Sequence, residues 1–346
     1  MRLSRPLAWL VAVLVTVLAA CSGTTPSGSA GPTAGSAEPS LPFESTAPSP
    51  SPIAYPLTLT DDEGTAVTIP AAPKTIVSLT PATTETIFAI GAGPALAGRT
   101  DADDYPAQAS AVNVVVKLGR VDVEQVVGLS PDLVLAGGNG FTPPDVVAQL
   151  RALRIPVVVV YAKDVGGVLA DIRLVGQAAG HIGPADDLAD SMSQQIAAIR
   201  AATDGIDRPS VFYEIDATSA IYTAADQSFL AEMLAIAGGE PVTTGSTTAY
   251  DIPLEKLVAA DPAIILLGDA AYGVTPDLVA ARPGWGTIAA VKARRIIAVD
   301  DVVITRPGPR LVQGLVDLVR AIHPELGIEP LDAGAPPEAS PAPAAS

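Results

Sequence analysis

A pattern that occurs twice sets the strongest limits on the fold of this chain. Residues 122–137 read DVEQVVGLSPDLVLAG, and residues 252–268 read IPLEKLVAADPAIILLG. In each copy a Glu, Glu124 or Glu255, lies near the start of a short amphipathic segment. A Pro follows seven positions later, and an apolar run then ends at a Gly. A helix, a breaker and a continuous apolar strand are typical of one step of a sheet covered on both faces. The repeat therefore predicts two α/β lobes of similar construction.

The length and charge of the chain narrow the class of protein. Its 346 residues leave room for two lobes with hydrophobic cores. The formal net charge is −17 at pH 7, and because contact with phosphates needs a basic surface, we expect no nucleic-acid partner. Acidity of this kind favours solubility or attraction to a basic partner.

Residues 1–20 have the features of an export signal. Arg2 and Arg5 precede an apolar run at residues 7–18, which is of signal-peptide length and short for a membrane span. The sequence LAAC that follows resembles the cleavage site of bacterial lipoproteins. We therefore expect cleavage before Cys21, the one Cys of the chain, and lipid attachment to it; a retained membrane helix is the alternative.

Composition separates folded from unfolded segments. Residues 21–54 consist of the Cys and a stretch rich in Ser, Thr, Pro, Gly and Ala, which predicts a disordered tether. Residues 329–346, rich in Pro and Ala, predict a disordered tail. Between them we expect an N-terminal α/β lobe at residues 55–162, a helical linker at residues 163–205 and a C-terminal α/β lobe at residues 206–328.

Periodicity and breakers predict the individual elements. Residues 57–60 and 66–69 flank DDEG and predict a hairpin. Thr83 or Thr84 is expected to cap a helix that runs to position 90. A helix at residues 184–203 would be about 30 Å long, enough to bridge two lobes, and an ordinary surface helix is the alternative. Buried strands are expected at residues 75–79, 96–99, 113–116, 133–136, 157–161, 211–215, 264–267 and 295–299, further helices at residues 145–153, 165–179 and 228–237, and a loop at residues 118–121.

The chain has few residues that could carry out catalysis. It contains two His, His181 and His323, and both fall at predicted helix ends, where we expect capping or solvated roles. No nucleophile elbow and no phosphate-binding Gly-rich loop is present in the sequence. A transition-metal site also lacks enough His and Cys. We therefore predict a protein that is not an enzyme and has no intrinsic cofactor or metal.

The loops that follow the predicted strands carry the candidate ligand-binding residues, because ligands of open α/β sheets bind outside the carboxyl ends of the strands. Aromatic side chains among Arg and hydroxyl groups suit a large, partly flat ligand with a polar rim. For any single residue, packing of the loop or a solvated surface is the alternative. The candidates are Thr80, Thr83, Arg99, Asp101, Tyr105, Leu118, Arg120, Asn139 and Phe141 in the first lobe, and Glu214, Tyr222, Tyr250, Tyr272, Arg306 and Arg310 in the second.

The order of motifs along the chain resembles a known family. The segments TLTDDEGTAVTIP, IVSLTPATTETIFAIGAG, GRTDADDYP and VEQVVGLSPDLVLAGG follow one another as in the periplasmic-binding proteins for iron–siderophores and vitamin B12, which serve bacterial ABC importers. The resemblance covers residues 57–324. It implies two α/β lobes joined by one long helix, with the ligand between the lobes.

The resemblance also implies residue roles. Glu124 and Glu255 fall where the family carries the acidic residues that dock onto Arg of the permease; helix-start carboxylates favoured by the helix dipole are the alternative. The vitamin B12 branch has an aromatic residue six positions before the first Glu, where this chain has Leu118, and the counterpart in the second lobe is Ala249, with Tyr250 beside it. A siderophore would use cations such as Arg99, Arg120, Arg306 or Arg310, and haem would use an axial Tyr such as Tyr105, Tyr222, Tyr250 or Tyr272.

The resemblance implies a monomeric, lipid-anchored, extracytoplasmic solute-binding protein. It would capture a metal chelate and deliver it to an ABC permease and its ATPase. A ferric siderophore or a corrinoid such as cobalamin is the expected ligand, with haem as a weaker third option. A surface-anchored α/β hydrolase, or an anchored sensor or adhesin that kept the binding fold, is the alternative.

Overall fold

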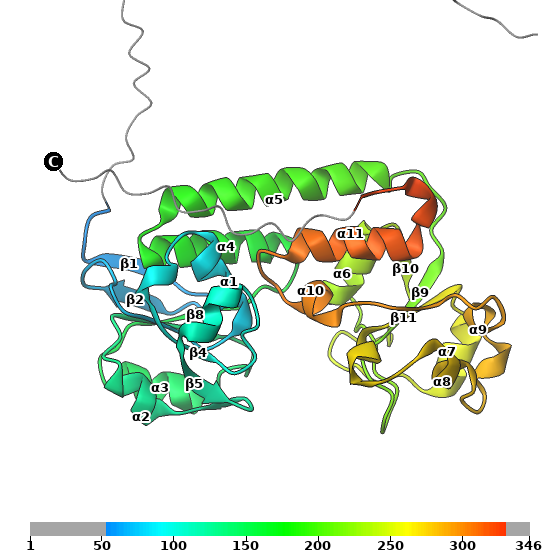
Figure 1. Ribbon diagram of the computed structural model, residues 1–346, viewed down its shortest axis with the longest axis horizontal. Coiled ribbons are helices and arrows are strands. Elements are labelled where there is room, and N and C mark those ends of the chain that lie inside the picture. The colour runs from blue at the N-terminus through cyan, green and yellow to red at the C-terminus, as the bar shows by residue number, and fades with distance from the viewer. Residues whose placement is uncertain (1–52, 330–346) are drawn as a thin grey trace, which may run out of the picture. The chain divides into compact units, whose positions relative to one another are not determined.

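The computed structural model of the protein describes residues 53–329 (Figure 1). The predicted signal peptide, the lipidation site Cys21 and almost all of the predicted tether and tail lie outside these residues. The described chain begins with an antiparallel hairpin, β1 (Leu57–Thr60) and β2 (Ala66–Ile69), at the positions predicted for it.

The first lobe is built on a six-stranded sheet in the order β6-β5-β4-β3-β7-β8. All neighbouring strands run parallel except β5 and β6, which form a short hairpin. Three helices, α1 (Pro81–Ala89), α2 (Val123–Gly128) and α3 (Pro144–Ala152), follow strands of this sheet. The strands are β3 (Ile76–Ser78), β4 (Leu96–Thr100), β5 (Asn113–Lys117), β6 (Arg120–Val121), β7 (Leu133–Gly137) and β8 (Val157–Val160).

The second lobe is built on a four-stranded parallel sheet in the order β10-β9-β11-β12. Its strands are β9 (Ser210–Glu214), β10 (Glu240–Pro241), β11 (Ile264–Leu267) and β12 (Ile296–Ala298). Its helices are α6 (Phe229–Ile236), α7 (Leu254–Ala260), α8 (Pro276–Ala280), α9 (Ala289–Lys292), α10 (Asp301–Thr305) and α11 (Leu311–Ile322).

The two repeat strands are apolar throughout because successive side chains enter different cores. In β7, Leu133 and Leu135 belong to one hydrophobic cluster and Val134 to another. In β11, Ile264 lies in the cluster that contains Leu133, whereas Ile265 packs in a third cluster. Side chains alternate across a strand, so a sheet covered on both faces needs apolar residues at every position. The predicted repeat of helix, breaker and strand is confirmed in both lobes.

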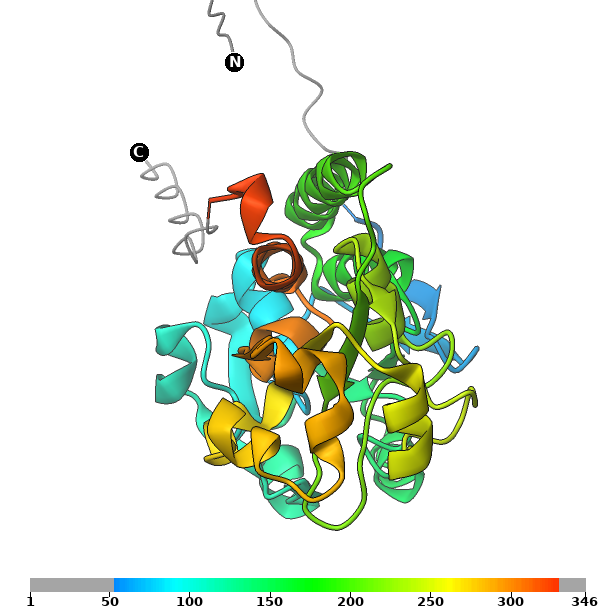
Figure 2. The same cartoon turned by 90° about the vertical axis from the view of Figure 1, so that its right-hand side faces the viewer.

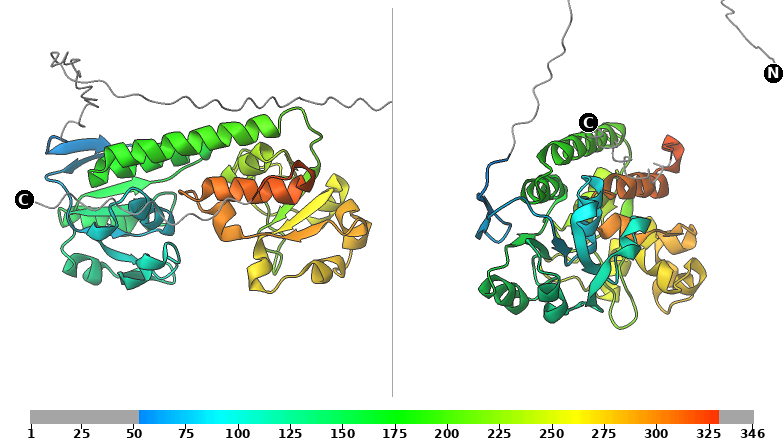
Figure 3. Two further views of the ribbon diagram at one scale, coloured as in Figure 1. Left: turned by 45° about the horizontal axis from the view of Figure 1, so that its top comes forward. Right: turned by 60° about the vertical axis from the view of Figure 1, so that its left-hand side comes forward.

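Two helices connect the sheets. Helix α4 (Val165–Ala179) ends at Gly180, whose φ of 81° is the left-handed conformation that Gly adopts without strain. Helix α5 (Ile182–Ala202) then packs against α4 and α11. Figures 2 and 3 show α4, α5 and α11 gathered on one side of the described chain. Gly176 permits the close contact of α4 and α5, since a Cβ there would lie 2.2 Å from the Cβ of Ala185.

The predicted α/β fold class is confirmed. All eight predicted strands are present, with each end within one residue of its expected position. Two local predictions are wrong. Thr80 caps α1 by accepting the backbone N–H of Thr83, so Thr83 and Thr84 lie inside the helix. Residues 118–121 are not simply a loop, because β6 turns back to pair with β5.

Candidate ligand-binding site

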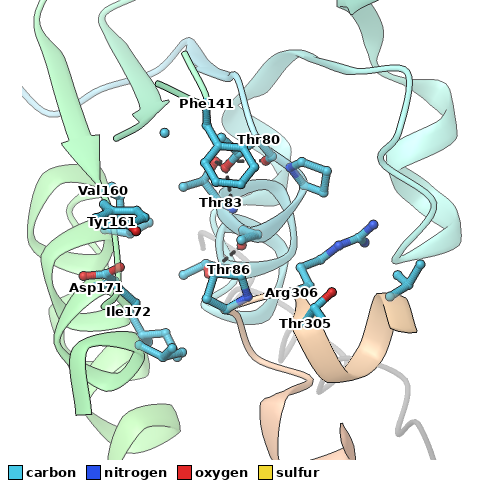
Figure 4. Close-up of a pocket in the computed structure, with 18 of the residues that line it drawn as sticks. Thr80, Thr83, Thr86, Phe141, Val160, Tyr161, Asp171, Ile172, Thr305 and Arg306 are labelled. Carbon is cyan, nitrogen blue, oxygen red and sulfur yellow. Dashed lines mark hydrogen bonds between the residues drawn. The ribbon is translucent and has the colours of Figure 1, made fainter. Parts of the chain in front are cut away.

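A pocket of ≈ 330 Å³ lies where the carboxyl ends of three strands of the first lobe meet helices α1, α4 and α10 (Figure 4). Thr80 follows β3, Gly137 ends β7 and Tyr161 follows β8. Helix α10 comes from the second lobe, so the pocket has walls from both lobes. Four of the predicted ligand-binding residues line it, namely Thr80, Thr83, Phe141 and Arg306.

Hydroxyl groups fix the α1 wall of the pocket. The Ser78 and Thr83 hydroxyl oxygens lie 2.6 Å apart at the end of β3. Thr84 donates to the buried carboxylate of Asp103 at 2.6 Å, and Thr100 bonds to the same carboxylate. Burial raises the pKa of Asp103, against the opposing effect of these hydrogen bonds. The network holds α1 against the loop that follows β4.

The two predicted Arg residues after α10 are bound by carboxylates of the first lobe. Arg306 Nη1 lies 2.6 Å from Glu85 Oε1 on α1 and 2.8 Å from Asp104 Oδ1. Arg310 contacts both oxygens of Glu85, with Nε at 3.0 Å and Nη2 at 2.7 Å. Its guanidinium carbon also lies 4.6 Å from the ring centre of Tyr105. Both cations are therefore already neutralised within the protein.

Several strand-end loops present large apolar side chains to solvent. In the first lobe Leu118 is 92 % exposed and Phe141 is 75 % exposed. In the second lobe Tyr272 is 89 % exposed and Tyr250 is 46 % exposed. Leu118 and Gly119 both have positive φ at the tip of the β5–β6 hairpin. The Leu118 N–H donates to Asp101 Oδ2 at 2.9 Å, so the predicted residue Asp101 helps to fix this tip.

The remaining predicted residues do not line the pocket. The Arg99 guanidinium donates to the carbonyls of Thr100 and Ser110, and the Asn139 amide donates to Tyr161 Oη at 2.9 Å. Arg120 lies exposed in β6, and Tyr222 forms single β-bridges with Asp216 and Asp251.

Glu214 lies beneath the surface of the second lobe. Its side chain is fully buried and forms two hydrogen bonds with Arg282, at 2.5 and 2.8 Å. The guanidinium of Arg282 lies 4.8 Å from the ring centre of Trp285. Burial, together with the nearby Glu214, raises the pKa of Asp269 to about 7, although Arg282 acts to lower it.

Asp171 on α4 lines the pocket and was not predicted. Burial, followed by the charges of Asp62 and Asp164, raises its pKa to about 8. A signal for it does exist in the sequence. Asp171 interrupts the stripe formed by Val168, Ile172 and Val175, which are all buried, so its position faces the interior.

Glu124 and Glu255, predicted to contact a permease, lie in the first turns of α2 and α7 and are exposed. In Figure 1 both helices lie on the side away from α5. Neither carboxylate forms an ion pair with any described residue. Their predicted role stays a prediction.

Comparison with known proteins identifies the family. Residues 76–303 match the family model of the periplasmic binding proteins. This chain belongs to that family. As a periplasmic binding protein it has the two-lobe fold of the solute receptors of ABC importers. Homologues of this kind bind solutes and are not enzymes, which agrees with the prediction from the sequence.

Three similar proteins illustrate the range of the family. The chain is 34% identical over 276 residues to the uncharacterized ABC transporter substrate-binding lipoprotein YvrC of Bacillus subtilis, covering 78% of this chain and 87% of that one. It is 29% identical over 280 residues to the cobalamin-binding protein of Halobacterium salinarum, covering 78% and 74%. The periplasmic haem-binding protein RhuT of Roseiflexus aligns with a TM-score of 0.64 at 28% identity, covering 73% of this chain and 99% of that one.

Within residues 53–329, no helix combines the length and apolar composition that a membrane crossing requires. No group of three or more His, Cys, Asp or Glu in this range is arranged to hold a metal ion.

Proposed function

We propose that this periplasmic binding protein captures a corrinoid outside the cytoplasmic membrane and delivers it to an ABC permease and its ATPase. The observation that carries the proposal is that strand-end loops of both lobes expose large apolar side chains. Leu118 and Phe141 extend from the first lobe, and Tyr250 and Tyr272 extend from the second. A macrocycle with a broad apolar face and a polar rim would cover such side chains.

The charges of the site favour a corrinoid over an anionic ferric siderophore. Arg306 and Arg310 are paired with Glu85, and the Arg99 guanidinium donates hydrogen bonds to backbone carbonyls. Of the four predicted cations, only the Arg120 guanidinium forms neither an ion pair nor a hydrogen bond with the described residues. Because an anionic ligand would have to displace Glu85 from two Arg residues, a ligand rich in neutral amides suits the site better. The name of the Halobacterium relative, a cobalamin-binding protein, also supports a corrinoid as the ligand.

The sequence before residue 53 supports an anchored protein. Lipid on Cys21 and a tether at residues 21–54 would keep the binding domain close to the permease. Tethering raises the local concentration without any new contact. The name of YvrC, a lipoprotein, supports this part of the proposal.

Ligand binding is tested with the full chain purified in detergent. We expect cobalamin or cobinamide to raise the melting temperature, because a ligand at a hundredfold excess over its Kd stabilises the fold by about 2.7 kcal/mol. Leu118→Ala should weaken binding about tenfold or more, since burying a Leu side chain contributes about 1.5–3 kcal/mol. Leu153→Ala, at the exposed Leu that follows the last residue of α3, is the matched control and should have no effect. A melting shift with a ferric siderophore or haem, and none with either corrinoid, would contradict the proposal.

Permease docking is tested with Glu124→Ala and Glu255→Ala. We expect each variant to keep its corrinoid affinity and melting temperature but to bind the permease more weakly. Cells that carry either variant should take up corrinoid more slowly than wild-type cells. Loss of one partner of a desolvated charge pair costs about 2–5 kcal/mol, and loss of an exposed pair costs about 1 kcal/mol or less. Corrinoid uptake with the double variant should be slower than with either single variant.

Two other exposed helix-start acids provide controls for docking. Asp145 lies in the first turn of α3 and Asp277 in the first turn of α8. Their Ala variants remove the same helix-dipole interaction and the same charge. If uptake falls equally in these controls, net charge and not a docking contact is responsible.

A further inference from the structure

The α4 wall of the pocket contains a carboxyl group without a cationic partner. Asp171 is 7 % exposed, and no Lys, Arg or His of residues 53–329 forms an ion pair with it. Two other carboxylates act on it: Asp62 in the β1–β2 turn, by its charge and by a side-chain hydrogen bond, and Asp164 at the start of α4, by its charge. Figure 4 shows Asp171 below Tyr161, across the pocket from α1.

The opposite walls offer hydrogen-bond acceptors. The hydroxyl of Thr86 donates to the Ala82 carbonyl, and that of Thr305 donates to the Asp301 carbonyl, both at 2.8 Å. Each hydroxyl that donates to the backbone keeps its lone pairs for a ligand. The charged groups on the α10 side are Asp301 and Arg306, and Arg306 is held by Glu85 and Asp104. The pocket is thus rich in acceptors and provides no unpaired cation.

The size of the pocket fits a substituent better than a whole macrocycle. Its volume is ≈ 330 Å³, at the small end of ligand pockets. Phe141 lines the pocket and is also largely exposed, so it stands at the mouth. A ring lying against Phe141 would place one of its side arms inside.

We propose that this pocket receives an amide-bearing side arm of the corrinoid, and that Asp171 makes it select amide arms over carboxylate arms. The inference rests on the proposed function and adds the chemical class of ligand that the site accepts. An amide N–H₂ group supplies the donors that the Asp171 carboxyl and the Thr hydroxyls lack. A carboxylate arm would be buried beside Asp171 without a compensating cation, which is strongly unfavourable.

Ionisation of Asp171 changes the strength of this selection. As an acid Asp171 can give its proton to Asp62 or to an amide carbonyl, and as a carboxylate it accepts the amide N–H and repels a second negative charge. Because burial raises its pKa to about 8, the selection against carboxylates should increase as the pH rises through that value.

The test compares dicyanocobinamide, with amide arms, and dicyanocobyrinic acid, with carboxylate arms, as ligands of the full chain in detergent. At about pH 9 we expect Asp171→Asn to lower the ratio of the two affinities by about tenfold. Asp187→Asn, on the exposed surface of α5, makes the same change of net charge and should leave the ratio unchanged. The wild-type ratio should also fall between about pH 9 and about pH 6.5, a measurement that needs no variant.

The outcomes separate the two proposals. Binding of cobinamide with an equal ratio in wild type and Asp171→Asn, and no pH dependence in wild type, overturns the role of Asp171 alone. If neither corrinoid binds to the wild-type chain, both the proposed function and this inference are wrong.

Discussion

Replacing Glu85 by Ala is expected to lower the free energy of unfolding by about 3–5 kcal/mol. The Glu85 side chain is 1 % exposed and bonds to both Arg306 and Arg310. The variant would leave two largely buried guanidinium groups without their shared carboxylate. A loss of this size corresponds to a fall of about 10 °C in melting temperature, at about 2–4 °C for each kcal/mol. Urea and thermal unfolding of the full chain would measure it.

Asp104 provides the matched control, because it lies 2.8 Å from Arg306 and 59 % of its side chain is exposed. Asp104→Ala removes one carboxylate from the same cluster, and we expect a loss of about 1 kcal/mol or less, as for exposed ion pairs. Equal losses in the two variants would show that burial does not control the strength of this cluster.

The ion pairs of Glu85 with Arg306 and Arg310 also affect ligand binding. Glu85 lies on α1, whose residues form one wall of the pocket, and Arg306 directly follows α10, which forms another. The ion pairs therefore hold two pocket walls from different lobes in register. A site held in place before the ligand arrives loses less ordering entropy on binding. We expect the Glu85 variant to bind cobinamide more weakly for this reason, in addition to its lower stability.

The strands could be predicted from the sequence because the signal for each is local. Residues 133–136 and 264–267 are uninterrupted apolar runs bounded by breakers, and the structure places β7 and β11 there. The tip of the β5–β6 hairpin was missed because Leu118 is an unusual residue for a positive φ, where Gly, Asn or Asp is expected.

The site was harder to predict because its contacts are not local. Arg310 and Glu85 are 225 positions apart, so Arg306 and Arg310 were assigned as cations available to a ligand. The structure shows instead that carboxylates of the first lobe hold them. Asp171 was recognisable as a polar residue in an apolar stripe, but only the fold shows that this stripe borders a pocket. The role of the exposed aromatic residues rested on the general rule for strand ends.

Replacing Arg282 by Met is expected to lower the stability of the second lobe strongly, and more at high pH than at low pH. Arg282 is the cation that pairs with the fully buried Glu214, and it acts to lower the pKa of Asp269 beside it. Removing one partner of a buried pair costs about 3–5 kcal/mol. Met retains much of the volume that packs against Trp285, so the variant tests charge more than packing.

The direction of the pH effect follows from the proton that Asp269 holds in the folded state. Its folded pKa is raised to about 7 from the ordinary Asp value of 3.8, so the folded state binds more protons than the unfolded state between these two pH values. This carboxyl therefore makes stability fall as pH rises across that window. Without Arg282 the pKa of Asp269 should rise further, and the fall in stability should continue to higher pH.

Urea unfolding at about pH 5 and about pH 8 should show a small loss of stability at the lower pH and the full loss at the higher. Equal losses at both would mean that protonation of Asp269 does not contribute, and that the unpaired Glu214 or the lost packing against Trp285 causes the loss. Restored stability in Glu214→Leu combined with Arg282→Met would show that the unpaired charge had caused the loss, since an apolar pair of similar volume can replace a buried ion pair.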